Sequence, residues 1–345
     1  MLELPGNQTR THSVTQENSV AVLLIVGNQV SGAGKTSLAA ALLVTAKAAG
    51  KQAAYFKPFS SEPDSDSDVV FISGLLQSTS GGPAVPAPKP LAGLTDAASM
   101  DEARAEVSRL ESETGLVVIE APDTAGNLGG PYAPNQKTIL VHRYRQQAGV
   151  GTVAEQINAS TGMAGIVVNA VPVHRRDEVD RSLGGLSVPV AVIPESRGML
   201  AVTVEQLAEH LGGQWVLDPV NINVPLERFM IGGNIMDTGP TYFGRYAKQA
   251  VITRVERPDI QMACFGENTK CLVLTGPGEP NEYIKAEALR REVPLIQVRS
   301  NTLDTVESLA GLLDKADART AAKATHFAGL LERYMRAEAV ERLLS

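Results

Sequence analysis

Short, continuous apolar runs alternate with segments of helical spacing in the first part of the chain. The first run covers residues 21–26, and a glycine-rich loop and an Ala- and Leu-rich segment over 36–49 follow it, with Gly50 just past the end. An unbroken apolar run is typical of a strand buried on both faces of a parallel sheet, and a glycine commonly ends a helix. We therefore predict a strand, a loop and a helix in that order.

The same alternation continues as far as Pro194. Further strands are predicted at 53–56, 116–119, 138–141, 165–169 and 189–193, and helices at 100–113 and 151–161. Residues 78–98 are rich in Ser, Gly and Pro, which favours a flexible insertion. Strands that alternate with helices predict an open parallel sheet with helices on both faces.

A second, smaller α/β domain is predicted after Pro194. Residues 203–206 form a capping-box pattern, which indicates the start of a helix. Strands are then predicted at 250–253, 271–275 and 295–298, and helices from about 258, 280 and 302. The domains predicted in this way are a flexible tail (1–18), a first α/β domain (19–198), a second (199–314) and a C-terminal amphipathic helix (315–345). The apolar face of that helix either packs on its own chain or serves assembly.

Composition and charge exclude several classes of function. The 345 residues carry a net charge of −7 and 4% aromatic residues, so neither a duplex nor a single-stranded nucleic-acid binder is expected. No apolar run approaches the roughly 20 residues of a membrane span, and the N-terminus has no export-signal pattern. The two cysteines and five scattered histidines form neither a disulfide framework nor a metal-ligand pattern. We expect a soluble cytoplasmic protein that binds neither nucleic acid nor membrane.

The loop after the first strand has the context of a phosphate-binding loop. It ends in Gly34-Lys35-Thr36 and opens a helix, so its backbone N–H groups and the helix dipole favour phosphate oxygens. A strict P-loop pattern would place glycine where this chain has Gln29, and the leading glycine is Gly27. The alternative is a glycine-rich turn before an ordinary helix. The residues predicted to bind the nucleotide here are Gly32, Ala33, Gly34, Lys35, Thr36 and Ser37.

Carboxylates follow two of the predicted strands. Asp64, Asp66 and Asp68 alternate after the second strand, and Glu120 ends the third. Such oxygens can hold Mg²⁺, but a solvated acidic loop is the alternative for the first three. Lys57 ends the second strand, where it is either a second phosphate-binding cation or a surface lysine.

These residues together carry a resemblance to dethiobiotin synthetase and its relatives, and more closely to dethiobiotin-synthetase-like P-loop proteins with a DRTGG domain. The same pair of domains forms the N-terminal part of long phosphotransacetylases. The first domain resembles the family at 27–36, 55–58, 66–68, 119–120 and 168–169. The second resembles the DRTGG domain at 229–233, 242–243, 250–253, 257–261 and 271–276. The resemblance covers about residues 20–312.

The resemblance implies a role for each matching position. Lys35 and Thr36 would hold the triphosphate and Mg²⁺ of bound ATP, with Asp68 and Glu120 as further metal ligands. Lys57 would lie near the substrate and the γ-phosphate, so that Lys35 and Lys57 are the predicted catalytic residues. Two further positions would border the nucleotide base, namely Asn169 and Pro194. A homodimer is also implied.

The sequence departs from the family pattern at several positions, and these departures favour a regulatory protein over an enzyme. Residues 121–123 read Ala-Pro-Asp where a relative would often show Gly, and 253–257 lack the glycine pair of the DRTGG loop. The chain also lacks the phosphotransacetylase catalytic domain, so acetyl transfer is not expected. We expect first a regulatory or sensing ATPase whose second domain and C-terminal helix transmit the nucleotide state to a dimer or partner. A small-molecule effector or substrate is a further expected ligand. The alternatives are an ATP-dependent ligase or small-molecule kinase with its own substrate, and a non-catalytic assembly protein.

Overall fold

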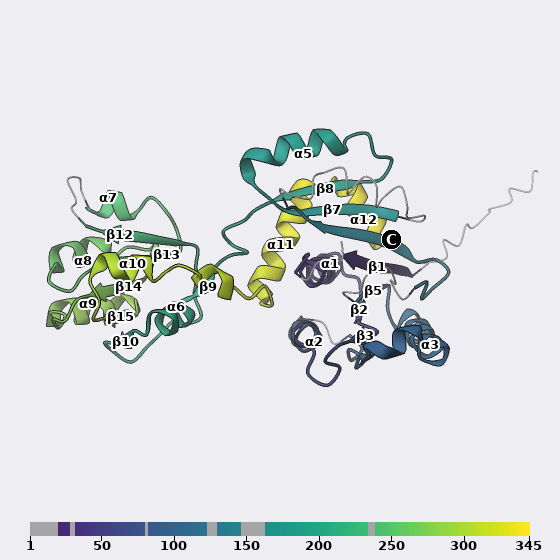
Figure 1. Ribbon diagram of the computed structural model, residues 1–345, viewed down its shortest axis with the longest axis horizontal. Coiled ribbons are helices and arrows are strands. Elements are labelled where there is room, and N and C mark those ends of the chain that lie inside the picture. Colours follow the sequence, from purple (N-terminus) through teal and green to yellow (C-terminus); the bar gives the residue numbers. More distant parts are fainter. Residues whose placement is uncertain (1–19, 28–31, 80–81, 123–129, 146–162, 234–238) are drawn as a thin grey trace, which may run out of the picture.

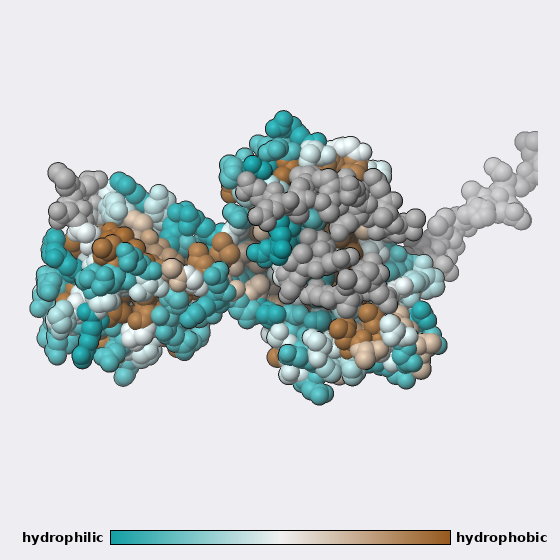
Figure 2. Space-filling model, viewed as in Figure 1, coloured by the Kyte–Doolittle hydropathy of each residue, from teal (hydrophilic) through white to brown (hydrophobic). Residues whose placement is uncertain are grey.

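The chain forms two α/β lobes joined by a narrow waist (Figures 1 and 2). The computed structural model describes residues 20–27, 32–79, 82–122, 130–145, 163–233 and 239–345. The predicted tail 1–18 and the predicted helix 151–161 lie outside these ranges. We call the part built on the six-stranded sheet the first lobe and the part built on the five-stranded sheet the second lobe.

The first lobe contains the predicted parallel sheet. Its strand order is β2-β5-β1-β6-β7-β8, and all neighbours run parallel. The strands are β1 (Ala21–Gly27), β2 (Ala53–Phe56), β5 (Leu116–Glu120), β6 (Lys137–Arg143), β7 (Met163–Val171) and β8 (Val190–Pro194). Because all six point the same way, the residues that follow each strand meet at one edge of the sheet.

Helices cover both faces of this sheet, as its apolar runs predict. Along β1, Leu23 and Ile25 join one core, and Leu24 and Val26 join the core on the opposite face. The first core includes α1 (Lys35–Ala48) and α2 (Ser67–Thr79), and the second includes α3 (Ala97–Glu113) and α5 (Arg176–Leu183). The P-loop NTPase-like parallel fold predicted from the sequence is therefore confirmed.

Helix α2 is a structural element that the sequence pattern did not predict. Its residues Ile72, Leu75 and Leu76 are buried in the same core as α1. Residues 82–98, which belong to the predicted flexible insertion, also have more regular structure than we expected. There β4 (Lys89–Pro90) pairs with β3 (Phe59–Ser60), a strand that precedes α2 in the chain, and a 3-10 turn η1 (Leu91–Thr95) leads into α3. The Asp96 carboxylate accepts a hydrogen bond from the Ser99 amide, so α3 begins earlier than predicted.

The second lobe is the smaller α/β unit predicted after Pro194. Its sheet order is β10-β15-β14-β13-β12, parallel except at the β10 edge. The strands are β10 (Gln214–Trp215), β12 (Arg228–Gly232), β13 (Gln249–Arg254), β14 (Thr269–Thr275) and β15 (Leu295–Val298). The helices are α6 (Val204–Leu211), α7 (Gly239–Phe243), α8 (Pro258–Cys264), α9 (Glu282–Arg291) and α10 (Thr302–Glu307). The capping box at Thr203 and Gln206 is present, and both cysteines are buried free thiols.

The last segment of the chain returns to the first lobe. After the 3-10 turn η3 (Leu312–Lys315), α11 (Ala321–Tyr334) and α12 (Ala337–Leu344) pack on the face that α1 covers. The segment predicted as one amphipathic helix thus contains two, because residues 335 and 336 have extended backbone angles. The second lobe is inserted before the last two helices of the first, and the chain crosses the waist twice (Figure 1). The domain boundaries at 198 and 314 stay predictions.

A short two-stranded sheet and a single turn complete the described elements. Strand β9 (Val202–Thr203) pairs antiparallel with β11 (Pro225–Leu226), and the 3-10 turn η2 (Val173–Arg175) precedes α5. Among the described residues, none of the helices is long and apolar enough to cross a membrane.

We predict that the first lobe depends on α11 for stability. Leu331 is 1% exposed in the core that α11 shares with α1. Leu331→Ala should lower the free energy of unfolding of this lobe by about 3 kcal/mol, because it leaves a cavity in a packed core. Circular dichroism during urea unfolding measures the change. The control is Leu303→Ala, at a side chain that is 67% exposed, and it should stay within about 0.5 kcal/mol of wild type. Equal effects of the two variants would contradict this prediction.

Candidate functional site

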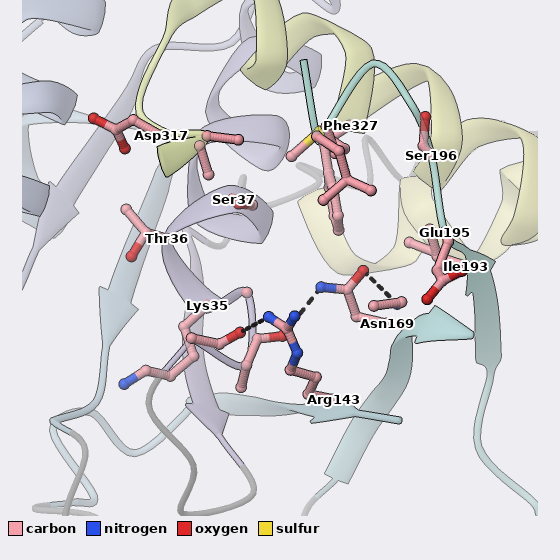
Figure 3. Close-up of a pocket in the computed structure, with 18 of the residues that line it drawn as sticks. Lys35, Thr36, Ser37, Arg143, Asn169, Ile193, Glu195, Ser196, Asp317 and Phe327 are labelled. Carbon is pink, nitrogen blue, oxygen red and sulfur yellow. Dashed lines mark hydrogen bonds between the residues drawn. The ribbon is translucent and has the colours of Figure 1, made fainter. Parts of the chain in front are cut away.

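A cavity of about 680 Å³ lies at the carboxyl edge of the first sheet. One wall consists of the start of α1 and the residues at the ends of the strands. The opposite wall consists of residues 313–319 and of Phe327 and Leu330 on α11. Figure 3 shows Asp317 and Phe327 on this second wall, with Lys35, Thr36 and Asn169 on the first. The cavity therefore lies between segments from both ends of the chain.

Almost all of the predicted site residues line this cavity. The lining includes Gly32, Ala33, Gly34, Lys35, Thr36, Ser37, Asp68, Glu120, Asn169 and Pro194. Lys57 is not part of the lining, but its Nζ donates to Asp68 Oδ2 at 2.7 Å. The structure brings these residues together, and their roles in binding and catalysis stay predictions.

The backbone at the start of α1 requires glycine. Gly34 is the N-cap residue with φ 105°, and a Cβ there would lie 2.5 Å from the Asn169 Nδ2. The Asn169 Nδ2 donates to the Ala33 carbonyl at 3.1 Å, and Arg143 donates to the Gly32 carbonyl at 2.8 Å (Figure 3). Residues from two strand ends thus fix the loop carbonyls. The first-turn amides of α1 lack intrahelical acceptors, as at any helix start, which favours an anion in the cavity.

Glu120 is a buried carboxylate beside the first turn of α1. It accepts hydrogen bonds from the Thr36 hydroxyl at 3.0 Å and from the Tyr55 hydroxyl at 2.9 Å. The Lys35 Nζ lies 4.0 Å from Glu120 Oε1 and donates to the Ala121 carbonyl at 2.6 Å. Burial raises the pKa of Glu120, and the nearby charge of Asp68 raises it further, while Lys35 opposes the shift. Added positive charge at this point would therefore stabilise the ionised form.

The three alternating aspartates have different environments. Asp64 is exposed, whereas Asp66 is buried and accepts hydrogen bonds from the amides of Asp68 and Val69 at 3.0 Å each. Asp66 is therefore the N-cap of α2, and it also pairs with Lys57 at 2.8 Å. Burial alone would raise the pKa of Asp66, but the bonds from Lys57 and from a serine hydroxyl hold it below its ordinary value. Of the three, only Asp68 lines the cavity.

The oxygen atoms on the cavity wall fit a magnesium ion bound together with phosphate. Thr36, Asp68 and Glu120 supply a hydroxyl and two carboxylates, which are hard donors of the kind that Mg²⁺ prefers. In the part of the chain that the structure describes, no three His, Cys, Asp or Glu residues cluster to hold a metal by themselves. Mg²⁺ commonly takes one or two carboxylates and completes its shell with phosphate oxygens and water. The donor set therefore fits Mg²⁺ that arrives with a nucleotide.

The lining residues that the sequence analysis missed include Arg143, Arg319 and Phe327. Arg143 lies at the end of β6, so the rule for strand ends could have identified it. Arg319 donates from Nε to Asp68 Oδ1 at 2.8 Å across 251 residues of sequence, and Phe327 lies on a helix beyond the second lobe. No local pattern indicates the last two, because only the return of the chain to the first lobe brings them to the cavity.

The fold and the cavity define a P-loop protein of the NTPase-like class. A family model described as an AAA domain matches residues 22–200, and a model of the DRTGG domain matches residues 206–312. Because the first match covers more than half of the chain, the chain belongs to this family of AAA domains. The two matches confirm the resemblance to dethiobiotin-synthetase-like P-loop proteins with a DRTGG domain.

Solved structures with weaker likeness include proteins from three organisms. Cobyrinic acid a,c-diamide synthase from Mycobacterium smegmatis with ADP and magnesium shares 19% identity over 52% of this chain and 88% of its own, at a TM-score of 0.38. The CBS and DRTGG domains of the Clostridium perfringens pyrophosphatase with diadenosine tetraphosphate share 14% identity with this chain. The match covers 44% of this chain and 75% of the other, at a TM-score of 0.30. The MinC:MinD cell division complex of Aquifex aeolicus shares 13% identity over 52% of this chain and 84% of its own, at a TM-score of 0.36. Likenesses this weak carry no argument about function.

We predict that the Asp66 carboxylate stabilises the first lobe through its charge and its cap. Asp66→Ala should lower the free energy of unfolding by about 2 kcal/mol at pH 7, because α2 loses its N-cap and Lys57 loses a partner. Since the pKa of Asp66 is below its ordinary value of 3.8 in the folded protein, this contribution is present above that value. The difference from wild type should shrink as the pH falls below about 3.8.

Urea unfolding of both proteins between about pH 7 and pH 3 checks this prediction. The matched control is Asp64→Ala, because that aspartate is exposed. A difference between wild type and Asp66→Ala that stays constant over the whole range would contradict the assignment of the charge.

Proposed function

We propose that this protein binds ATP with Mg²⁺ in the cavity and acts as a regulatory or sensing protein. The observation that carries the proposal is the shared wall: residues 313–319, which join the second lobe to α11, line the same cavity as the start of α1. A ligand that fills the cavity contacts both walls. Nucleotide binding and the arrangement of the linker are therefore coupled.

The polar side of the cavity supports a triphosphate as its ligand. Glycine-dependent backbone at the start of α1 and the ammonium of Lys35 suit phosphate oxygens. Thr36, Asp68 and Glu120 would hold Mg²⁺, which supplies charge neutralisation at the phosphates. Their oxygens lie on the same wall as the loop.

The apolar side of the cavity supports a base next to α11. Phe327, Leu330 and Met199 line it together with Pro194. Apolar walls of this kind, with a few polar groups that fix orientation, are typical of nucleotide and cofactor pockets. The base would therefore contact a helix that follows the second lobe in the chain.

An ATP-dependent ligase or small-molecule kinase is the second candidate. The observation that favours it is the position of Lys57, whose ammonium is bonded to the cavity-lining Asp68. Together with Lys35, it would place two cations where charge develops on a transferred phosphoryl group. A metabolite that stimulates release of ADP would favour this candidate over a sensor.

An assembly role has less support from the C-terminal segment. The apolar residues of α11 and α12, including Leu331 and Leu343, pack within the first lobe. A homodimer, a small-molecule effector and a cytoplasmic location stay predictions from the resemblance and composition.

Calorimetric titration of ATP with Mg²⁺ tests the proposed function. Lys35→Ala should weaken binding by about 2 kcal/mol, roughly 30-fold in Kd, because it removes charge-assisted hydrogen bonds to phosphate. The control is Lys47→Ala, at an exposed lysine in the last turn of the same helix, and its Kd should equal that of wild type.

Two outcomes would contradict the proposal. Wild type that binds no nucleotide would exclude the cavity as an ATP site. Equal binding by wild type and a folded Lys35→Ala variant would place the nucleotide elsewhere.

A further inference from the structure

Asp68 has both of its carboxylate oxygens engaged by cations. Oδ2 accepts from the Lys57 Nζ at 2.7 Å, and Oδ1 accepts from the Arg319 Nε at 2.8 Å. The two cations differ in burial, because the Lys57 side chain is 12% exposed and Arg319 is 39% exposed. Lys57 is also held by Asp66 at 2.8 Å. Arg319 is therefore the partner that Asp68 loses more easily.

Arg319 lies on the wall of the cavity that faces the loop. Its neighbours on that wall include Asp317, and the opposite wall carries the start of α1 and Thr36. A guanidinium forms paired hydrogen bonds with phosphate as readily as with carboxylate, and it keeps its charge at all physiological pH values. A triphosphate in this cavity would bring more negative charge to Arg319 than Asp68 alone supplies.

We propose that Arg319 exchanges Asp68 for the terminal phosphate of the bound nucleotide. This proposal rests on the proposed function, because it assumes a nucleotide in the cavity. The exchange frees Asp68 Oδ1 to act as an oxygen ligand and gives the site a contact that ATP makes and ADP does not. Arg319 thus distinguishes ATP from ADP.

The segment around Arg319 links this exchange to both lobes. On one side, Leu312 is buried in a core of the second lobe, and the Gln206 side chain on α6 donates to the Lys315 carbonyl at 3.4 Å. On the other side, the Thr320 hydroxyl caps α11, and the Lys323 Nζ donates to the Asp317 carbonyl at 2.8 Å. Arg319 also pairs with Asp317 at 3.1 Å. A change of partner at Arg319 therefore acts on a short segment anchored at both ends.

The ratio of the Kd values for ADP and ATP, both with Mg²⁺, tests the proposal in the full-length chain. Wild type should bind ATP more tightly than ADP by about 10-fold or more, since one bidentate charged contact to phosphate is worth about that factor. In Arg319→Gln the two Kd values should become nearly equal. In wild type, ATP breaks the pair with Asp68 and ADP leaves it in place, so the wild-type ratio measures the phosphate contact net of that half-exposed ion pair. In Arg319→Gln neither nucleotide makes or breaks this pair. Arg319→Lys keeps the charge without the paired bonds, so its ratio of Kd values should lie between those of wild type and Arg319→Gln.

The matched control is Arg336→Gln, which removes the same charge at an exposed arginine outside the cavity. Its ratio should equal that of wild type. An unchanged ratio in Arg319→Gln, with both nucleotides bound, would overturn this proposal and leave the proposed function standing. Wild type that binds neither nucleotide would overturn both.

A second readout follows the linker itself. Amide hydrogen exchange in residues 312–320 should differ between the ATP and ADP complexes of wild type, and this difference should disappear in Arg319→Gln. The same difference in both proteins would overturn the role of Arg319 as the connection between phosphate and linker.

Discussion

The packing of α11 against α1 is the contact on which the candidate site depends. Helix α1 carries the phosphate-loop residues at its start, and α11 shares its buried core through Phe327 and Leu331. Because the second lobe lies between β8 and α11 in the sequence, this contact forces the chain to cross the waist twice. The second crossing places residues 313–319 along the cavity. The insertion of the second lobe thus positions its own linker at the candidate site.

Electrostatics at the cavity favour a ligand that brings both negative and positive charge. Glu120 is buried beside Lys35, and its pKa is raised by burial, so the ionised form gains from a nearby cation. Asp66 and Asp68 have pKa values that burial would raise but that the bonds from Lys57 hold down. Lysine and arginine side chains therefore balance these acids. In a metal-bound triphosphate, the metal ion would pair with the acidic side chains and the phosphates would pair with the lysine and arginine side chains.

Much of the fold could be predicted from local patterns in the sequence. The apolar run at β1 and the capping box at Thr203 each depend on a few neighbouring residues, and both have the predicted structure. Helix α2 was missed because its start, at Asp66, also matches an acidic loop. The break between α11 and α12 was missed because the amphipathic spacing continues across residues 335 and 336.

The residues of the candidate site also fall into those that the sequence indicated and those that it did not. Glu120, at the end of β5, could be found because parallel strands end at one edge, and Asn169 was implied by the family resemblance. Arg319 and Phe327 could not be found, because their place depends on long-range packing after an inserted lobe. The motif and its place between a strand and a helix identified the loop, but neither they nor the family resemblance identified the wall opposite to it. The proposed regulatory role depends on that wall.

A structure of the full-length chain with Mg²⁺ and a non-hydrolysable ATP analogue is the most direct measurement. We expect phosphates at the start of α1 and contact between the nucleotide and the wall formed by residues 313–319 and α11. A nucleotide that touches only the strand ends of the first lobe, with that wall separate from it, would contradict the coupling of the two lobes through this cavity.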